Sequence, residues 1–139
     1  MTARALNANL FVYGSLLTAE RHPMGERLSR EARLVGAATL QGRLYAISWY
    51  PGAVDSADPG DLVHGEIFAL ADPAASLAWL DQYEGVTHGP ASVTKPAEYA
   101  RLEREVRLVD GSRRTAWVYL YQRPVDGRTW IAGGRWSAR

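Results

Sequence analysis

Two short stretches of this sequence hold residue types that could do chemistry, and the first is LFVYGSL at 10–16. An apolar run breaks here at Gly14, which permits a sharp turn and a close approach of a ligand to the main chain. Successive amides that point one way form a binding site for a carboxylate, a phosphate or an oxyanion, and the hydroxyls of Tyr13 and Ser15 could add hydrogen bonds. The stretch lacks the Gly-Lys-Ser/Thr ending of a phosphate loop and the Gly-x-Ser-x-Gly frame of a hydrolase. An ordinary strand-ending turn remains the alternative.

The second stretch ends the helix predicted over 73–84. Leu77, Leu80 and Glu84 fall at positions i, i+3 and i+7, so Glu84 projects from the same stripe as two residues expected in the core. It also lies in the last helical turn, where the helix dipole disfavours a carboxylate. Burial and the dipole should both raise the pKa of Glu84, which makes it a candidate general acid and base near neutral pH. The alternative is a terminal Glu whose flexible stem returns the carboxylate to solvent.

Local signals predict the elements that must position these residues. The helix over 73–84 has Asp72 as its N-cap, Pro73 in its first turn and Gly85 as its stop. A weaker helix is expected at 23–30, and the segment 49–61, rich in Pro and Gly, is expected to be a loop. Period-two or continuously apolar patterns predict strands over five ranges: 9–15, 32–48, 62–70, 98–109 and 115–121.

Details of the strands suggest how they assemble. The segment 32–48 is one bent strand or two consecutive strands, with Gly36 and Gly42 at bulges or close approaches. Asp110-Gly111 predicts a hairpin between the last two strands. Along 98–109 one face carries Leu102, Val106 and Leu108, and the other carries charged residues. Along 115–121 the aromatic and the aliphatic residues separate in the same way: Trp117, Tyr119 and Tyr121 against Ala116, Val118 and Leu120.

The tally of about six strands and two short helices, without an internal repeat or linker, predicts a single domain over 1–139 of the α+β class. We expect a small mixed, mostly antiparallel β-barrel with short peripheral helices. Composition fits this size, since 47% of the 139 residues are hydrophobic and the chain contains five Trp and seven Tyr.

Composition and charge also exclude several function classes. With no Cys there is no disulfide and no thiolate ligand, and His22, His64 and His88 lack the spacing of a metal site, so no metal is expected. A net charge of +1 gives no general attraction to nucleic acid or to a membrane surface. No apolar stretch approaches the length of a membrane span and no signal peptide is visible, so we expect a cytoplasmic protein.

Seven segments, in order along nearly the whole chain, resemble the gamma-glutamylcyclotransferase-like family, specifically its short bacterial branch. They are LFVYGSL (10–16), YPGAV (50–54), VHGEIF (63–68), LDQYEGV (80–86), EYAR (98–101), AWVYLYQRPVDG (116–127) and GGRW (133–136). The YGSL turn alone is modest evidence for the resemblance. Its combination with a Glu after a helix, Tyr-x-Arg and Trp-x-Tyr-x-Tyr is strong evidence for it. The resemblance departs at Arg135, where family members often have an acidic residue.

The resemblance implies a barrel with a cavity, in which Glu84 takes a proton from the α-ammonium of a gamma-glutamyl substrate and later gives one to the leaving amine. It implies that Tyr99 helps to orient the substrate and that no metal or organic cofactor takes part. It also implies a cradle for the gamma-glutamyl group formed by four residues of the loop: Tyr13, Gly14, Ser15 and Leu16. The product would be 5-oxoproline, and the released amine and the oligomeric state stay open.

Two rival functions follow from the same sequence. The first is a non-catalytic binding module, in which the pocket holds a glutamyl-like or 5-oxoproline-like ligand without turning it over, as short-branch members that lack the Glu would do. The second is a small barrel that binds nucleic acid through its arginines, which the near-neutral charge disfavours. The position of Glu84 separates the first rival from the enzyme, because a general base must point into the cavity beside the YGSL loop.

Overall fold

The computed structural model describes residues 6–86 and 98–137, and His88 lies outside these ranges. The elements in chain order are β1 (Asn9–Val12), a short 3₁₀ helix η1 (Thr18–Glu20), α1 (Pro23–Glu31), β2 (Ala32–Ala46), β3 (Pro51–Asp55), β4 (Leu62–Leu70), α2 (Pro73–Glu84), β5 (Tyr99–Leu108), β6 (Arg113–Tyr121) and β7 (Thr129–Ile131). Of the helices in the described part of the chain, none has the length and hydrophobicity that crossing a membrane requires.

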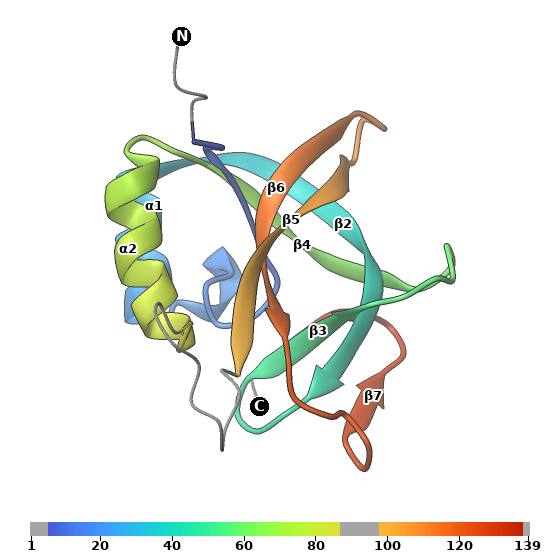
Figure 1. The fold of residues 1–139 in the computed structure, drawn as a ribbon. Coiled ribbons are helices and arrows are strands. Elements are labelled where there is room, and N and C mark those ends of the chain that lie inside the picture. Colours follow the sequence, from blue (N-terminus) through green and yellow to red (C-terminus); the bar gives the residue numbers. More distant parts are fainter. Residues whose placement is uncertain (1–5, 87–97, 138–139) are drawn as a thin grey trace, which may run out of the picture.

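Five strands close into a barrel in the order β2-β4-β1-β6-β5, and β5 returns to pair with β2. The β1–β6 pair is parallel and the other pairs of the ring are antiparallel, so the barrel is mixed. Figure 1 shows α1 and α2 together on one side of the barrel, with β3 and β7 at its lower end. This architecture confirms the predicted α+β class and the small, mostly antiparallel barrel with short peripheral helices.

The long strand β2 is continuous and serves two sets of partners. Residues 32–41 pair with β4 except for Val35, residues 42–46 pair with β3 on one edge, and residues 44–46 pair with β7 on the other. The register with β4 shifts between Leu34 and Gly36, where a bulge lies. At Gly42 a β-carbon would meet the carbonyl oxygen of Val54 at 2.7 Å, so only glycine allows β3 this close. The expected roles of both glycines are confirmed.

The prediction of a loop over 49–61 is wrong for residues 51–55, which form β3. Pro51 and Gly52 mimic a turn in composition, but Pro is tolerated as the first residue of a strand. Among the described residues β3 pairs with β2 alone, through contacts such as Tyr45–Gly52 that no local pattern reveals. The three-residue strand β7 was not predicted for the same reason, since only its pairing with β2 defines it.

The hydrophobic interior consists of two clusters, separated by the wall of the barrel. The alternate residues of β6 divide as predicted: Ala116, Val118 and Leu120 belong to a cluster inside the barrel, whereas Tyr119 and Tyr121 belong to a second cluster that includes Leu77 and Leu80 of α2. The helices therefore cover the outer, aromatic face of this strand.

The prediction that Leu102, Val106 and Leu108 share one buried face of β5 is only partly right. Val106 and Leu108 of β5 are buried, but Leu102 is 36% exposed. The neighbouring Arg101 lies on the opposite face, where its side chain reaches the buried carboxylate of Asp81 in α2. At this end of β5 the helix-facing side is thus occupied by a charged residue.

Glu31 connects the two helices. Its Oε1 accepts hydrogen bonds from Ser76 Oγ (2.8 Å) and Trp79 Nε1 (2.9 Å) of α2, and its Oε2 accepts one from Arg27 Nε (2.9 Å). The guanidinium of Arg27 lies 4.3 Å above the Trp79 ring. Together these contacts lower the pKa of Glu31 to about 2, the hydrogen bond from Arg27 being the largest cause.

Candidate active site

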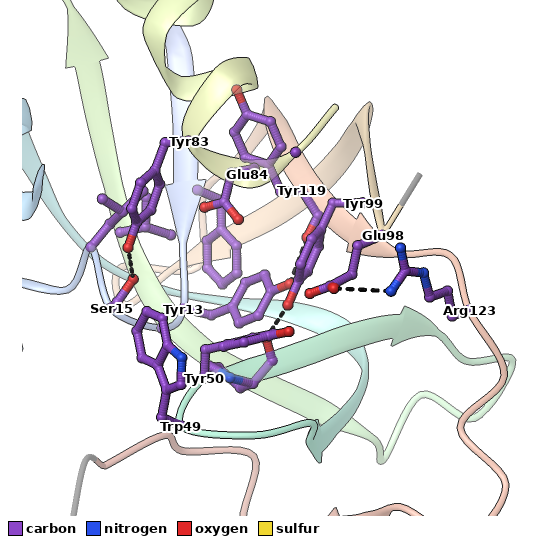
Figure 2. A pocket seen from close by; sticks show the side chains of 16 residues that line it. Tyr13, Ser15, Trp49, Tyr50, Tyr83, Glu84, Glu98, Tyr99, Tyr119 and Arg123 are labelled. Atoms are coloured by element: carbon purple, nitrogen blue, oxygen red, sulfur yellow. Dashed lines mark hydrogen bonds and ion pairs between the residues drawn. The ribbon is translucent and has the colours of Figure 1, made fainter. Parts of the chain in front are cut away.

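One cavity of about 510 Å³ lies where β1, α2, β5 and β6 end or begin. Its lining includes all of the residues singled out from the sequence, namely Tyr13, Gly14, Ser15, Leu16, Glu84 and Tyr99. The structure therefore brings the YGSL loop, the end of the helix and the start of β5 to one place (Figure 2).

Glu84 is the last residue of α2, and the end of the helix fixes its direction. Gly85 follows in the left-handed conformation at φ 75°, which glycine adopts without strain. The amide of Gly85 donates to Gln82 O (3.3 Å) and that of Val86 donates to Asp81 O (2.9 Å), the two bonds of a Schellman motif. Figure 2 shows the half-buried Glu84 carboxylate pointing into the cavity, between Tyr83 and Tyr99.

Burial and the nearby charge of Glu98 raise the pKa of Glu84 from its ordinary value of 4.5 to about 7, burial being the larger cause. A charged group loses hydration when it leaves water, and a like charge adds repulsion. The carboxyl therefore exchanges protons near neutral pH, as a group that must both accept and donate a proton requires.

A buried polar network holds this helix against the barrel one turn before Glu84. Asp81, which is 3% exposed, accepts hydrogen bonds from Arg101 Nε (2.7 Å) and Nη2 (3.1 Å) of β5. Asp81 Oδ1 also accepts one from the Tyr119 hydroxyl of β6 (2.6 Å). The Arg101 guanidinium lies 4.4 Å above the Trp117 ring. Charge-assisted bonds of this kind fix orientation well, so the network positions the end of α2 that carries Glu84.

The YGSL loop forms one part of the cavity lining. Its turn closes through a hydrogen bond from Leu17 N to Gly14 O (3.0 Å). In the described part of the chain no acceptor bonds the amides of Ser15 and Leu16. The Ser15 hydroxyl is engaged with the Tyr83 hydroxyl at 2.7 Å, a contact that ties the loop to α2.

Gly14 has a packing role that the sequence did not reveal, while its expected role in ligand approach stays a prediction. A β-carbon at this position would lie 2.9 Å from Cγ and 3.0 Å from Cδ of Pro51. The sequence suggested that glycine allows a ligand to approach; the structure shows that it allows β3 to pack against the loop. The consequence for substitution is the same, since any side chain forces the loop and β3 apart.

The hydroxyls of Tyr13 and Tyr99 are occupied by the main chain. Tyr13 donates to Tyr119 O (2.5 Å) and accepts from Ala53 N (3.1 Å), whereas Tyr99 donates to Pro51 O (2.6 Å). Burial raises the pKa of both phenols well above the ordinary value. Both side chains therefore stay neutral and act as walls, and the Tyr99 oxygen keeps the capacity to accept one hydrogen bond from a ligand.

Sequence reasoning missed two charged residues of the cavity. Arg123 Nη1 lies 3.2 Å from Glu98 Oε2, and the side chains are 33% and 24% exposed. Both residues line the cavity (Figure 2), and both lie inside motifs quoted above, EYAR and QRPVDG, without an assigned role. They stand next to strand ends, where periodicity gives no signal.

Aromatic side chains surround the entrance to the cavity. Trp49, which is 63% exposed, meets Tyr50 edge to face with 5.0 Å between ring centroids and stacks on His22 at 6.3 Å. By contrast, Arg135 lines a different cavity together with His64 and Glu66. The departure from the acidic residue of the family therefore lies outside the lining of the candidate active site.

The fold and the site define a small closed barrel with a cavity, which is lined by the YGSL loop and by a half-buried carboxyl whose pKa is raised. Residues 10–138 match the family model described as "Gamma-glutamyl cyclotransferase, AIG2-like". The "Gamma-glutamylcyclotransferase family protein YtfP" of Escherichia coli K12 is 38% identical over 133 residues, which cover 94% of this chain and 96% of YtfP. The chain belongs to the gamma-glutamyl cyclotransferase family.

Solved structures agree with this assignment. The solution structure of ytfP from Escherichia coli has a TM-score of 0.62 at 35% identity and is matched over 92% of this chain and 95% of that one. YkqA of Bacillus subtilis has a TM-score of 0.68 at 22% identity, a likeness that shows the fold alone. The match covers 94% of this chain but only 40% of YkqA.

Proposed function

We propose that the protein releases 5-oxoproline from an L-gamma-glutamyl amine or dipeptide, with Glu84 as general base and then general acid. One observation supports this above the others. A half-buried carboxyl with a pKa of about 7 shares a cavity with Ser15 and Leu16, whose amides have no acceptor among the residues that the structure describes. Family membership supplies the substrate class, and the geometry supplies groups for each chemical step.

The reaction is an internal acyl transfer. Glu84 takes a proton from the α-ammonium, and the freed nitrogen forms a bond to the γ-carbonyl carbon. The Glu84 carboxyl gives this proton to the leaving nitrogen, whose bond to that carbon breaks as the carbonyl re-forms. Glu84 then takes a second proton from the ring nitrogen and passes it to the released amine. Of the three ammonium protons one stays on the lactam nitrogen and two end on the released amine, an ammonium ion at neutral pH. Nothing else is consumed.

The cavity fits the demands of this reaction. Ring closure is intramolecular, so holding the glutamyl chain folded supplies much of the rate; effective molarities for such reactions reach about 10⁵–10⁸ M. The amides of Ser15 and Leu16 suit a carboxylate or the oxyanion that develops on the γ-carbonyl oxygen. Tyr13 and Tyr99 restrict the space available, and Tyr99 can accept a hydrogen bond from the substrate ammonium.

The test is an assay of 5-oxoproline release from a panel of L-gamma-glutamyl amines and dipeptides, with no metal added. At least one should react. Glu84→Gln keeps the shape but removes the proton carrier, so turnover should fall by roughly 10²–10⁴-fold while binding persists. Glu105→Gln, which removes a carboxylate that is 63% exposed and outside the cavity lining, is the matched control and should retain activity.

The pH profile gives an independent readout. The base must be ionised, so kcat/KM should fall as the pH drops through about 7, the pKa of Glu84. Full activity in Glu84→Gln would refute the mechanism. A panel that gives no 5-oxoproline, with ligands still bound, would replace the enzyme with the binding module.

A further inference from the structure

We infer that the Glu98–Arg123 ion pair recognises the amino-acid head of the substrate by exchanging partners with it: Arg123 binds the α-carboxylate and Glu98 binds the α-ammonium. The inference rests on the proposed function for its substrate class. Every gamma-glutamyl compound carries this pair of opposite charges on adjacent groups, and the cavity contains the complementary pair.

The position of the pair is the first argument. Both side chains line the cavity, and in the view of Figure 2 they lie across it from the Ser15–Tyr83 hydrogen bond. The main chain brings the two residues close together, because Gln122 N donates to Glu98 O at 2.8 Å where β5 begins and β6 ends. The pair is thus a built feature of the cavity and not a chance contact of two flexible chains.

The geometry of the pair is the second argument. The 3.2 Å contact between Arg123 Nη1 and Glu98 Oε2 is longer than the 2.7 Å contact of Arg101 with Asp81, and its side chains are more exposed. A partly exposed ion pair contributes little net stability, so a ligand that offers the same charges can replace either partner in this contact. Glu98 is also hydrogen-bonded to Tyr50. Guanidinium also matches a carboxylate in shape, which lysine would not.

Glu98 also lies near the proposed base, Glu84. Glu98 lies close enough to raise the pKa of Glu84, so the two carboxyls share one region of the cavity. An α-ammonium bound at Glu98 therefore lies beside the base that takes its proton. With the α-carboxylate at Arg123, the amides of Ser15 and Leu16 remain for the γ-carbonyl oxygen, and each substrate group has its own partner.

The inference is tested by measuring, with calorimetry, how tightly three probes bind to the Glu84→Gln protein. They are L-gamma-glutamyl methylamide, glutaric acid monomethylamide, which lacks the ammonium, and 4-aminobutyric acid methylamide, which lacks the α-carboxylate. The full probe should bind about 10–100-fold more tightly than either truncated probe, as lost charged hydrogen bonds imply. Adding Arg123→Met should abolish the preference for the carboxylate, and adding Glu98→Gln should abolish the preference for the ammonium.

Two further variants make the test decisive. Arg113→Met removes an exposed arginine that pairs with Glu105 at 3.4 Å, and this matched control should keep both preferences. The double variant Glu98→Arg with Arg123→Glu keeps an ion pair but reverses it, so it should fold and lose affinity for the full probe. Parental affinity in this swap, or parental preferences in Arg123→Met, would overturn the inference. These binding ratios do not depend on turnover, so an inactive protein that shows them would refute the proposed reaction and not the recognition.

Discussion

The ionised carboxylate of Glu84 should make the folded protein less stable, and Glu84→Gln should remove this penalty. The folded-state pKa is about 7 against an ordinary 4.5, and each pKa unit corresponds to about 1.4 kcal/mol. Because the folded state holds the proton more tightly than the unfolded chain, the free energy of unfolding falls as the pH rises from about 4.5 to about 7. Above that range the full penalty of about 3 kcal/mol applies.

Urea unfolding of the wild type and of Glu84→Gln at pH 5, 6, 7 and 8 measures the effect. The two proteins share every other titratable group, so the difference between their unfolding free energies isolates Glu84. That difference should shift in favour of Glu84→Gln by about 2–3 kcal/mol between pH 5 and pH 8, with unchanged m-values. Glu105→Gln should leave the pH dependence as in the wild type, because its charge is solvated in the folded and unfolded chain alike.

A difference that stays constant from pH 5 to pH 8 would show that the Glu84 carboxylate is hydrated as well in the fold as in the unfolded chain. It would remove the physical basis for Glu84 as a base near neutral pH. A difference that grows in favour of the wild type would mean that the carboxylate has a cationic partner. Either result would refute the reasoning without an activity assay.

Two further predictions concern the loop and the helix anchor. Ser15→Ala keeps the amide of the loop and should retain most 5-oxoproline release. Gly14→Val should abolish the release, because a β-carbon would lie 2.9 Å from Cγ of Pro51 in β3. Complete loss of release in a folded Ser15→Ala would indicate a catalytic hydroxyl. Asp81→Asn should lower the free energy of unfolding by about 3–5 kcal/mol in urea, since Arg101 would keep an uncompensated buried charge. Asp55→Asn, which removes a partner that is 56% exposed, should cost less than about 1 kcal/mol, and equal losses would contradict the anchor.

The elements that the sequence predicts well are those that local signals define. The helix at 73–84 is confirmed at both ends, since the Asp72 side chain accepts from Ala75 N and Gly85 ends the helix in the left-handed conformation. The weaker helix at 23–30 is confirmed as α1, which continues to Glu31. Strands β3 and β7 escape prediction because their hydrogen bonds come from β2 and not from their own pattern.

In the candidate site, too, the residues marked by local sequence signals were predicted and those placed by strand pairing were not. The inward face of Glu84 follows from helical periodicity, and the turn at Gly14 follows from a broken apolar run. Glu98 and Arg123 were missed because each stands just outside a strand, and the register that pairs Tyr99 with Tyr121 is what places them together. The engagement of the Tyr13 hydroxyl with Ala53 was equally beyond the sequence, because it joins β1 to a strand that was not predicted.

The hydroxyls of Tyr13 and Tyr99 cover one edge of β3, which limits the substitutions that could enlarge this pocket. Beyond its pairing with β2, the second edge of β3 offers the Pro51 carbonyl and the Ala53 amide, and the two phenol hydroxyls bind both. An open strand edge is a template for association with another chain. The tyrosines thus act as a substitute for a missing strand, and a smaller side chain at either position would enlarge the pocket only by uncovering main chain that promotes aggregation.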